Sequence, residues 1–240
     1  MEAARNLQSS PAQRILRGVA LALPIVMGYV PIGFAFGVLA QKNGLSLWNA
    51  AAMSIFVYAG SSQLIAVGLL GAAVPAASII MTTFIVNLRH MLMSASLAPY
   101  LKRWNKMEIS GFAYELTDES FAIHARRFPM GDTGKIETFA VNITAQLAWV
   151  GGTLLGVLAG QLITDIEPLG LDYALPAMFI ALLVLQLFNR IQLAVAVFTG
   201  VASVGLALAG AGQWNVMVAT VLGATLGVLL ELWTKKPSFS

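Results

Sequence analysis

The chain has 240 residues, of which 58% are hydrophobic and only 10% are charged, and its net charge is +3. Because soluble domains carry about 25% charged residues, this composition excludes a soluble globular protein and predicts an all-α polytopic membrane protein. The small positive charge lies in short segments between apolar runs, which is typical of membrane topology and not of nucleic-acid binding. The chain contains no cysteine, so disulfides and thiolate metal sites are excluded, and we expect no cofactor.

Three apolar runs, each long enough to cross a bilayer as a helix, occupy the N-terminal part of the chain: 18–41, 46–73 and 75–100. The first run contains Pro31 and Gly33, and we expect the helix to be kinked there. The second run is broken at 58–63, where the sequence YAGSSQ replaces bulky apolar residues by small and polar ones. A basic cluster at 102–106 closes the third run.

Further apolar runs predict four more spans, at 138–164, 173–189, 191–211 and 213–234. Between the two groups lies 108–128, which is long enough to span but contains four acidic residues. We interpret this segment as one embedded polar helix. Eight spans result if it crosses the membrane, and seven if it only re-enters it. The distribution of Lys and Arg between the two sides does not decide between these topologies.

A weak internal similarity relates QLIAVGLLG at 63–71 to QLAWVGGTLLG at 146–156. It predicts two three-helix copies and two additional spans within a single transporter domain covering 1–240: residues 18–101, 108–189 and 191–234. An odd number of spans per copy makes the copies inverted, an arrangement common in secondary transporters. On this basis Asn142 and Gln146 are the second-half equivalents of the polar break. Chance is the alternative, because Leu, Gly and Val dominate the composition.

Arg89 lies near the middle of the third run, roughly 21 Å along a helix from Pro75 and roughly 18 Å from Leu101. A charge at such a depth costs on the order of 3 kcal/mol, so it is normally paired and faces the bundle interior or an aqueous cavity. Helical periodicity separates Arg89 from a polar stripe formed by Thr83, Asn87, His90 and Ser94. We expect this stripe to line a substrate path. The alternatives are a structural ion pair for Arg89 and a structural core histidine for His90.

The sequence ELTDES at 115–120 supplies the expected partner for Arg89. On a continuous helix, Glu115, Asp118 and Glu119 fall within about 100° of arc. Three carboxylates on one face repel each other, which favours proton uptake by at least one of them. We therefore predict that Arg89 pairs with Asp118 or Glu119. Together with Glu115, these residues form an ion-pair and proton-coupling set. A solvated helix outside the membrane is the alternative.

The break at 58–63 is the predicted solute site. Gly60 and the two serines after it allow local unwinding, which frees backbone N–H and C=O groups to bind a carboxylate or an ammonium group, as discontinuous helices do in transporters. The candidate substrate-binding residues, with two members from the polar stripe, are Tyr58, Gly60, Ser61, Ser62, Gln63, Asn87 and His90. Close helix packing through small residues is the alternative.

Sequence patterns of hydrolases, metalloproteases and nucleotide-binding enzymes are absent, so we expect no enzymatic activity. Four motifs, in this order, resemble the AzlC family of branched-chain amino acid exporters, also called the YgaZ or BrnF type. They are GYVPIGFAFGVLA at 28–40, YAGSSQLIA at 58–66, NLRHMLMSASLAP at 87–99 and LTDESFA at 116–122.

The resemblance implies a bacterial inner-membrane permease that exports leucine, isoleucine and valine, and often methionine, driven by the proton or charge gradient. It also implies a small AzlD-type membrane subunit of about four spans as partner. It assigns no functional residues, so the site residues above rest on physical reasoning alone. Two alternatives stay open: a permease for another small amino acid or organic solute, and a membrane assembly subunit that transports nothing.

Overall fold

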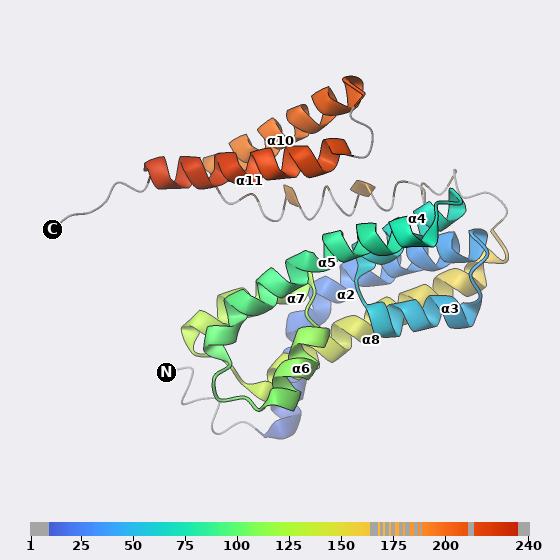
Figure 1. Cartoon of the computed structure of the whole chain (residues 1–240). Helices are drawn as coiled ribbons and strands as arrows, with labels where there is room; N and C mark the ends of the chain where they lie inside the picture. The colour runs from blue at the N-terminus through green and yellow to red at the C-terminus, as the bar shows by residue number, and fades with distance from the viewer. Residues whose placement is uncertain are drawn as a thin grey trace. The chain divides into compact units, whose positions relative to one another are not determined.

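The computed structural model describes residues 10–163, 189–210 and 214–234, with single positions between 168 and 187. Every element in these residues is helical (Figure 1), which confirms the all-α class. Two compact units, Met1–Phe179 and Ile180–Ser240, divide the chain. The elements are α2 (Pro11–Lys42), α3 (Leu47–Ala52), the π-helix η1 (Met53–Val57), α4 (Gly60–Gly71), α5 (Ala76–Leu97), the 3-10 helix η2 (Ala98–Tyr100), α6 (Lys106–Tyr114), α7 (Asp118–Arg127), the 3-10 helix η3 (Phe128–Met130), α8 (Lys135–Gly160), α10 (Arg190–Leu208) and α11 (Trp214–Thr234).

Four helices of the described residues are long and apolar enough to cross a membrane: Pro11–Lys42, Ala76–Tyr100, Lys135–Gly160 and Arg190–Leu208. Shorter apolar helices lie at Leu47–Val57, Gly60–Gly71 and Val218–Thr234. The chain is therefore a multi-pass membrane protein. The expected span at 173–189 falls outside the described residues except for single positions. The choice between seven and eight spans stays a prediction, as does the inverted repeat.

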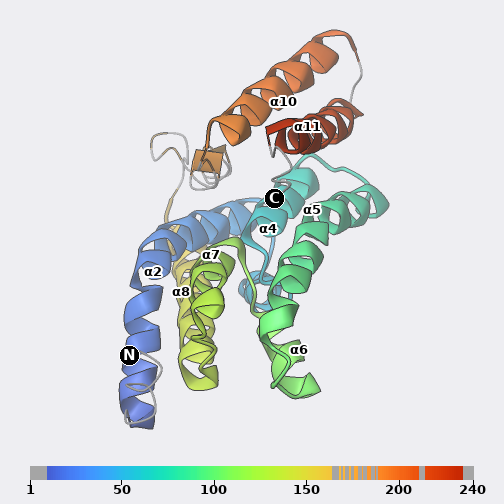
Figure 2. The same ribbon diagram turned by 90° about the vertical axis from the view of Figure 1, so that its left-hand side faces the viewer.

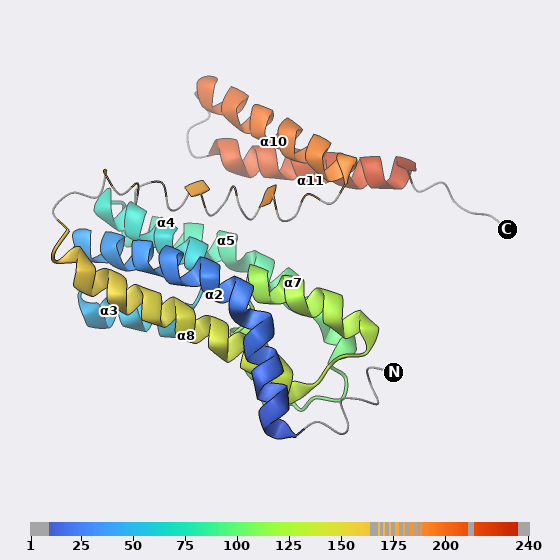
Figure 3. The same ribbon diagram turned by 180° about the vertical axis from the view of Figure 1, so that it is seen from behind.

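The first long helix, α2, begins with a capping box. The Ser10 hydroxyl accepts a hydrogen bond from the backbone N–H of Gln13, and the Gln13 side chain accepts one from the backbone N–H of Ser10. Pro24 and Pro31 lie inside the helix. Each proline removes one backbone hydrogen bond and crowds the preceding turn, which bends a helix. Figure 3 shows that α2 is bent.

Helices α2 and α8 lie side by side (Figures 1 and 3) and make the most extensive helix contact of the first unit. A methyl group added at Gly33 would lie 2.8 Å from the carbonyl oxygen of Trp149, and one added at Gly152 would lie 2.6 Å from that of Val30. The two backbones therefore touch, as small residues at four-residue spacing allow in membranes. Gly33, which we expected at a kink, contributes to this contact. The glycine contact comprises Gly33, Gly37, Gly152 and Gly156.

The second apolar run is broken within the segment predicted from its sequence. α3 passes into the π-helix η1, which ends at Val57 and is followed by Tyr58 as its C-cap. The φ angle of Tyr58 is 41°, in the left-handed region that non-glycine residues rarely adopt. A new helix, α4, then starts at Gly60. The π-helix and the left-handed residue together end one helix and turn the chain into the next.

The expected single polar helix at 108–128 is wrong, because the structure divides this segment into α6 and α7. Thr117 caps α7: its hydroxyl accepts a hydrogen bond from the backbone N–H of Ser120, and the Ser120 hydroxyl accepts one from the backbone N–H of Thr117. This capping box starts a new helix at Asp118. With nine and ten residues, neither helix alone reaches the roughly 20 residues that a span requires.

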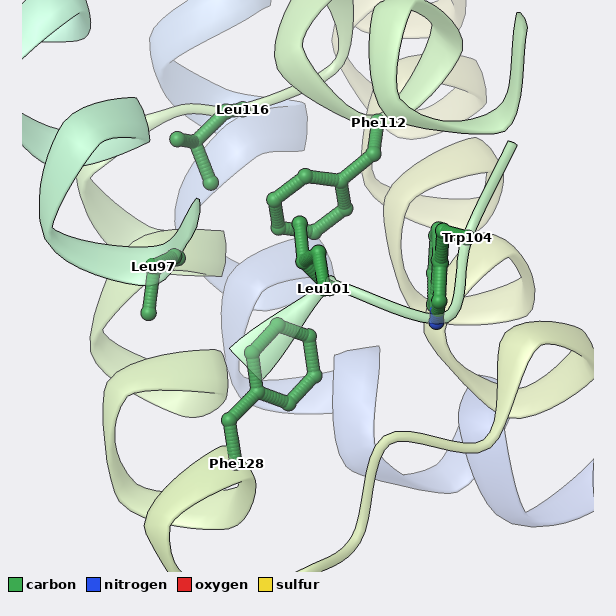
Figure 4. Close-up of a cluster of buried hydrophobic side chains, with 6 residues drawn as sticks. All are labelled: Leu97, Leu101, Trp104, Phe112, Leu116 and Phe128. Atoms are coloured by element: carbon green, nitrogen blue, oxygen red, sulfur yellow. The ribbon is translucent and has the colours of Figure 1, made fainter. Parts of the chain in front are cut away.

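A buried hydrophobic cluster holds α6 and α7 against the end of α5. Figure 4 shows the rings of Trp104 and Phe112 close together, and their centroids are 5.8 Å apart. Leu116 belongs to the segment between α6 and α7, so its burial keeps the start of α7 in place. Figure 2 shows α7 between α2 and α5, and α7 contacts both helices. The cluster consists of Leu97, Leu101, Trp104, Phe112, Leu116 and Phe128.

In the second unit, α10 packs against α11. Asn189 caps α10 and exchanges hydrogen bonds with Gln192. Thr199 of α10 lies directly against Gly223 of α11, where no larger residue fits without displacement. These two helices correspond to the last two expected spans.

Replacing Gly37 by alanine is expected to loosen the contact between α2 and α8. The added methyl group would meet the carbonyl oxygen of Thr153, and overpacking of this kind costs about 1–3 kcal/mol. Gly28→Ala on the same helix is the control, since a methyl group there has nothing within 4 Å. We expect Gly37→Ala alone to lower the midpoint of thermal unfolding in detergent, followed by tryptophan fluorescence. Equal midpoints for the two variants would contradict the close contact.

Candidate functional site

The candidate site lies where the first turn of α4 meets α5 and α7. The side chain of Tyr58, which precedes this turn, is buried and only 3% exposed. At Gly60 an added methyl group would lie 2.8 Å from the ring of Trp149, so α4 starts with its backbone against α8. The backbone N–H groups of such a first turn have no partner within the helix. The break therefore presents Ser61 and Ser62 beside backbone N–H groups that have no partner within α4.

Two polar residues of α5 bind the two serines that open α4. The Ser62 hydroxyl donates to Asn87 Oδ1 at 2.5 Å, and Arg89 Nη2 donates to the hydroxyl of Ser61. Helical periodicity put Arg89 on a different face from the polar stripe, but the length of its side chain lets it reach the same turn of α4 as Asn87. His90 of the stripe is half-buried, and its Nδ1 lies 3.2 Å from the backbone oxygen of Asn87.

Arg89 also forms an ion pair with α7. Its Nη1 lies 2.9 Å from Asp118 Oδ2, and the two side chains are 28% and 16% exposed. Asp118 occupies the first turn of α7, where the helix dipole favours a negative charge. One guanidinium group thus joins three helices, because it binds α4 through Ser61 and α7 through Asp118.

Glu119, the next acidic residue, binds α2 instead of Arg89. The hydroxyl of Tyr29 lies 2.5 Å from Glu119 Oε2 and 2.8 Å from Thr117 Oγ1. The phenol hydroxyl of Tyr29 donates to the carboxylate of Glu119, and the Thr117 hydroxyl lies within hydrogen-bond distance of the same phenol oxygen. Since Thr117 is the cap of α7, Tyr29 fixes the start of this helix against α2.

The expectation that three carboxylates share one helix face is wrong. Glu115 is the C-cap of α6, whereas Asp118 and Glu119 belong to the first turn of α7. The break between the two helices removes the regular spacing on which that expectation depended. One oxygen of Glu115, Oε2, is buried and has no hydrogen-bond partner in the part of the chain that the structure describes.

Two more buried polar atoms near the break have no partner among the described residues. They are the Tyr58 hydroxyl and Nε of Arg89. Glu115 is near enough to Tyr58 for an electrostatic interaction. Because buried polar groups in folded proteins are nearly always hydrogen-bonded, all three atoms are available to water or to a bound molecule. A carboxylate, a guanidinium and a phenol together suit a small polar or zwitterionic solute.

Gln63 is fully buried, and both ends of its amide have protein partners. Its Nε2 donates to Ser54 Oγ at 3.1 Å, and its Oε1 accepts from Trp149 Nε1 at 3.0 Å. The Ser54 hydroxyl lies 2.8 Å from that of Thr153. This network ties α4 to η1 and α8, so the amide of Gln63 is already engaged, and its role in solute binding stays a prediction.

The two residues expected as second-half equivalents have different partners. Gln146 Nε2 donates to the backbone oxygen of Ile55 at 3.3 Å, and the hydroxyl of Tyr114 donates to the same oxygen. Both satisfy a carbonyl of the π-helix next to the break. Asn142 Oδ1 instead lies 2.8 Å from Nε2 of His124 on α7.

Sequence analysis missed the residues that connect the site to α2 and α8. Trp149 stacks with Phe36 and meets Tyr29 edge-on, with ring centroids 6.1 and 5.4 Å away. No local pattern distinguishes these aromatic residues from ordinary apolar ones. Their partners lie far away along the chain, and only the fold brings them together.

A broken helix beside a partly buried ion pair in a polytopic α-helical membrane protein is an arrangement typical of the transporter class. Among residues 10–163, 189–210 and 214–234, no group of three or more His, Asp or Glu side chains is placed to hold a metal ion. The family model described as AzlC protein matches residues 24–163, more than half of the chain. The chain belongs to the AzlC family.

Relatives from several microorganisms are similar over most of their length. The chain is 30% identical to the inner membrane protein YgaZ of Escherichia coli (strain K12), over 90% of this chain and 89% of the relative. It is 34% identical to an uncharacterized membrane protein of Archaeoglobus fulgidus, over 88% and 92%. It is 26% identical to the branched-chain amino acid transport protein AzlC of Bacillus subtilis (strain 168), over 90% and 83%. No solved structure matches.

The ion pair between Arg89 and Asp118 is expected to stabilise the contact of α5 with α7. Arg89→Gln or Asp118→Asn each leaves a partly buried charge without its partner, and hydrogen bonds to charged groups are worth about 1.5–3 kcal/mol. Each single variant should lower the thermal unfolding midpoint in detergent, and the double variant should recover part of the loss. Strictly additive losses in this double-mutant cycle would show that the two side chains do not interact.

Proposed function

We propose that the chain is the large subunit of a secondary transporter that exports leucine, isoleucine and valine, and also methionine, across the cytoplasmic (inner) membrane. Family membership supports the class of protein, and the name of the Bacillus subtilis relative supports the substrate class. We propose further that export is coupled to the proton motive force, and that a small AzlD-type membrane subunit of about four spans is the partner. The resemblance in sequence motifs is the support for the partner.

The observation that carries this proposal is the break at Tyr58, after which α4 starts beside Arg89. The positive end of a half-helix attracts the carboxylate of an amino acid. The Tyr58 hydroxyl and Arg89 Nε are further donors without a partner among the described residues. For the positively charged ammonium group of the amino acid, Glu115 Oε2 is a suitable buried acceptor, and it could instead bind a proton.

The ion pair provides a way for protons to act on the helices. A proton on Asp118 would cancel its charge and so release the guanidinium of Arg89. Since Arg89 binds both Ser61 and Asp118, this release would loosen α7 from α4 and α5. Glu119 is the second candidate carboxylate, held by Tyr29 of α2. Proton binding would thus change the same contacts that surround the solute site.

Two alternatives remain. In the first, the same fold and site serve another small amino acid or an organic solute, because the backbone groups at the break recognise only the polar part of a solute. In the second, the chain is an assembly subunit that transports nothing, and its polar side chains only hold helices together.

Transport by purified protein in liposomes tests the proposal. We expect vesicles containing this chain and an AzlD-type subunit to move labelled leucine under a proton gradient. Arg89→Gln and Asp118→Asn should each reduce this movement roughly tenfold or more, because each removes one member of the ion pair, a loss equivalent to about 1.4 kcal/mol. An exchange of the two charges, Arg89→Asp with Asp118→Arg, should restore part of it.

Glu108→Gln is the matched control for loss of an acidic side chain. Glu108 lies at the start of α6 and pairs with Lys135 at 2.7 Å, apart from the site. The hydrogen bond from Lys135 holds the pKa of Glu108 below its ordinary value, so the control also removes a negative charge. Full transport by Arg89→Gln would reject the site. Movement of another solute but not leucine would favour the first alternative, and no movement of any solute, with or without the partner, the second.

A further inference from the structure

A second group of buried polar side chains lies between α7 and α8, and the proposed solute site does not use it. His124, Thr138 and Asn142 are each 0% exposed. Nε2 of His124 lies 2.8 Å from Oδ1 of Asn142. Three neighbouring atoms, Nδ1 of His124, Nδ2 of Asn142 and Oγ1 of Thr138, have no hydrogen-bond partner in the part of the chain that the structure describes.

Three unpartnered polar atoms at full burial need an explanation, because folded proteins satisfy nearly all such groups. Thr138 and Asn142 are one helical turn apart on α8, so their side chains lie on the same face. Internal water molecules typically make about three hydrogen bonds each to buried polar groups of this kind. A site with a ring nitrogen, an amide and a hydroxyl on neighbouring helices supplies the partners that such water needs.

The polar row continues along α7 towards the solute site. Ser120 precedes His124 by one helical turn, and both side chains are fully buried. The Ser120 hydroxyl lies 3.3 Å from Thr117 Oγ1, which in turn lies 2.8 Å from the hydroxyl of Tyr29. That phenol binds Glu119 at 2.5 Å. Buried hydroxyl groups thus connect Ser120, one helical turn from His124, to a carboxylate of the ion-pair and proton-coupling set.

The opposite end of the row reaches a charged cluster at the start of α8. Nη2 of Arg127 lies 2.9 Å from Asp132 and 3.2 Å from Glu137. The side chain of Asp132 is 30% exposed, so this end is open to the surroundings. Arg14 and Arg17 of α2 also interact electrostatically with Glu137. These are the charged groups that face this end of the row from α2, α7, the 131–134 segment and α8.

The sides of the row are apolar. The ring of Phe112 lies 5.3 Å from the ring of His124, centroid to centroid, and that of Phe128 lies 5.1 Å away. These rings shield the polar atoms of His124 from the rest of the bundle. Water admitted to this polar row would be confined to a narrow path between the aromatic rings.

From this arrangement we infer that a file of internal water molecules along Ser120, His124, Asn142 and Thr138 carries protons between Glu119 and the charged cluster around Arg127. This inference rests on the proposed function, since a proton-coupled transporter needs such a connection. An imidazole can accept a proton at one ring nitrogen and release another from the second, so no net charge stays on it. His124 is the central relay, and the other three side chains orient the water.

The first experiment detects the water path whether or not the protein transports leucine. The chain contains no cysteine, so Asn142→Cys and Val141→Cys each introduce a single thiol at neighbouring positions of α8 that are both 0% exposed. Silver ions, which are small enough to follow a water file, should react with the thiol of Asn142→Cys and protect it from a label added after denaturation. The thiol of Val141→Cys should stay unprotected. Equal protection of the two thiols would overturn the path.

The second experiment tests proton transfer by comparing two transport modes in liposomes. Gradient-driven leucine movement requires protons to reach the site, whereas exchange of labelled for unlabelled leucine involves no net proton movement. Thr138→Val removes only the hydroxyl and should reduce gradient-driven movement about tenfold while leaving exchange unchanged. Thr138→Ser keeps the hydroxyl and should behave as the wild type.

His124→Leu is expected to show the same split between the two modes, with Phe112→Leu as the control for altered packing around the ring. If His124→Leu does not fold, Thr138→Val decides, since it keeps the shape of the side chain. Wild-type gradient-driven movement in Thr138→Val would overturn the inference. If the proposed function itself is wrong, the wild type will move leucine neither under a gradient nor by exchange, which differs from both outcomes expected for Thr138→Val.

Discussion

The backbone contact between α2 and α8 positions the rest of the first unit. In a membrane, apolar side chains gain little by leaving lipid for protein, so close packing of backbones is what holds helices together. Glycines at four-residue spacing bring the two helices into contact. That contact places Tyr29 beside Glu119 and places Trp149 against both Gly60 and Gln63. The geometry of the helix break and of α7 depends on this contact, in which glycines let the backbones touch and Trp149 packs between Phe36 and Tyr29.

Two interrupted helices within a membrane protein are stable only if their released backbone groups find partners. At the first interruption, Tyr114 and Gln146 donate to the carbonyl of Ile55. At the second, the capping box of Thr117 satisfies the start of α7. Among the described residues, no side chain caps the start of α4 in an equivalent way. The start of α7 is therefore closed by protein groups, whereas the start of α4 keeps backbone donors for a ligand.

The sequence allowed prediction of the break before Gly60 and of the need to pair Arg89, because small residues in an apolar run and a charge at bilayer depth are local signals. It did not allow prediction of the division at Thr117, since a Thr and a Ser three residues apart form a less distinctive box than one with Glu or Gln. The contact of Tyr29 with Glu119 joins residues 90 positions apart. Nothing in the local pattern of either residue encodes that pairing.

The cap of α7 restricts where residues can be inserted or deleted in this part of the chain. From Thr117 onward, successive residues of the helix turn by about 100° each, so the acids near the cap and His124 one to two turns later keep fixed directions relative to each other. A single-residue insertion or deletion between Thr117 and His124 would rotate the histidine away from Asn142 while leaving Asp118 in place. Related chains that retain both contacts must therefore align without gaps through this short helix.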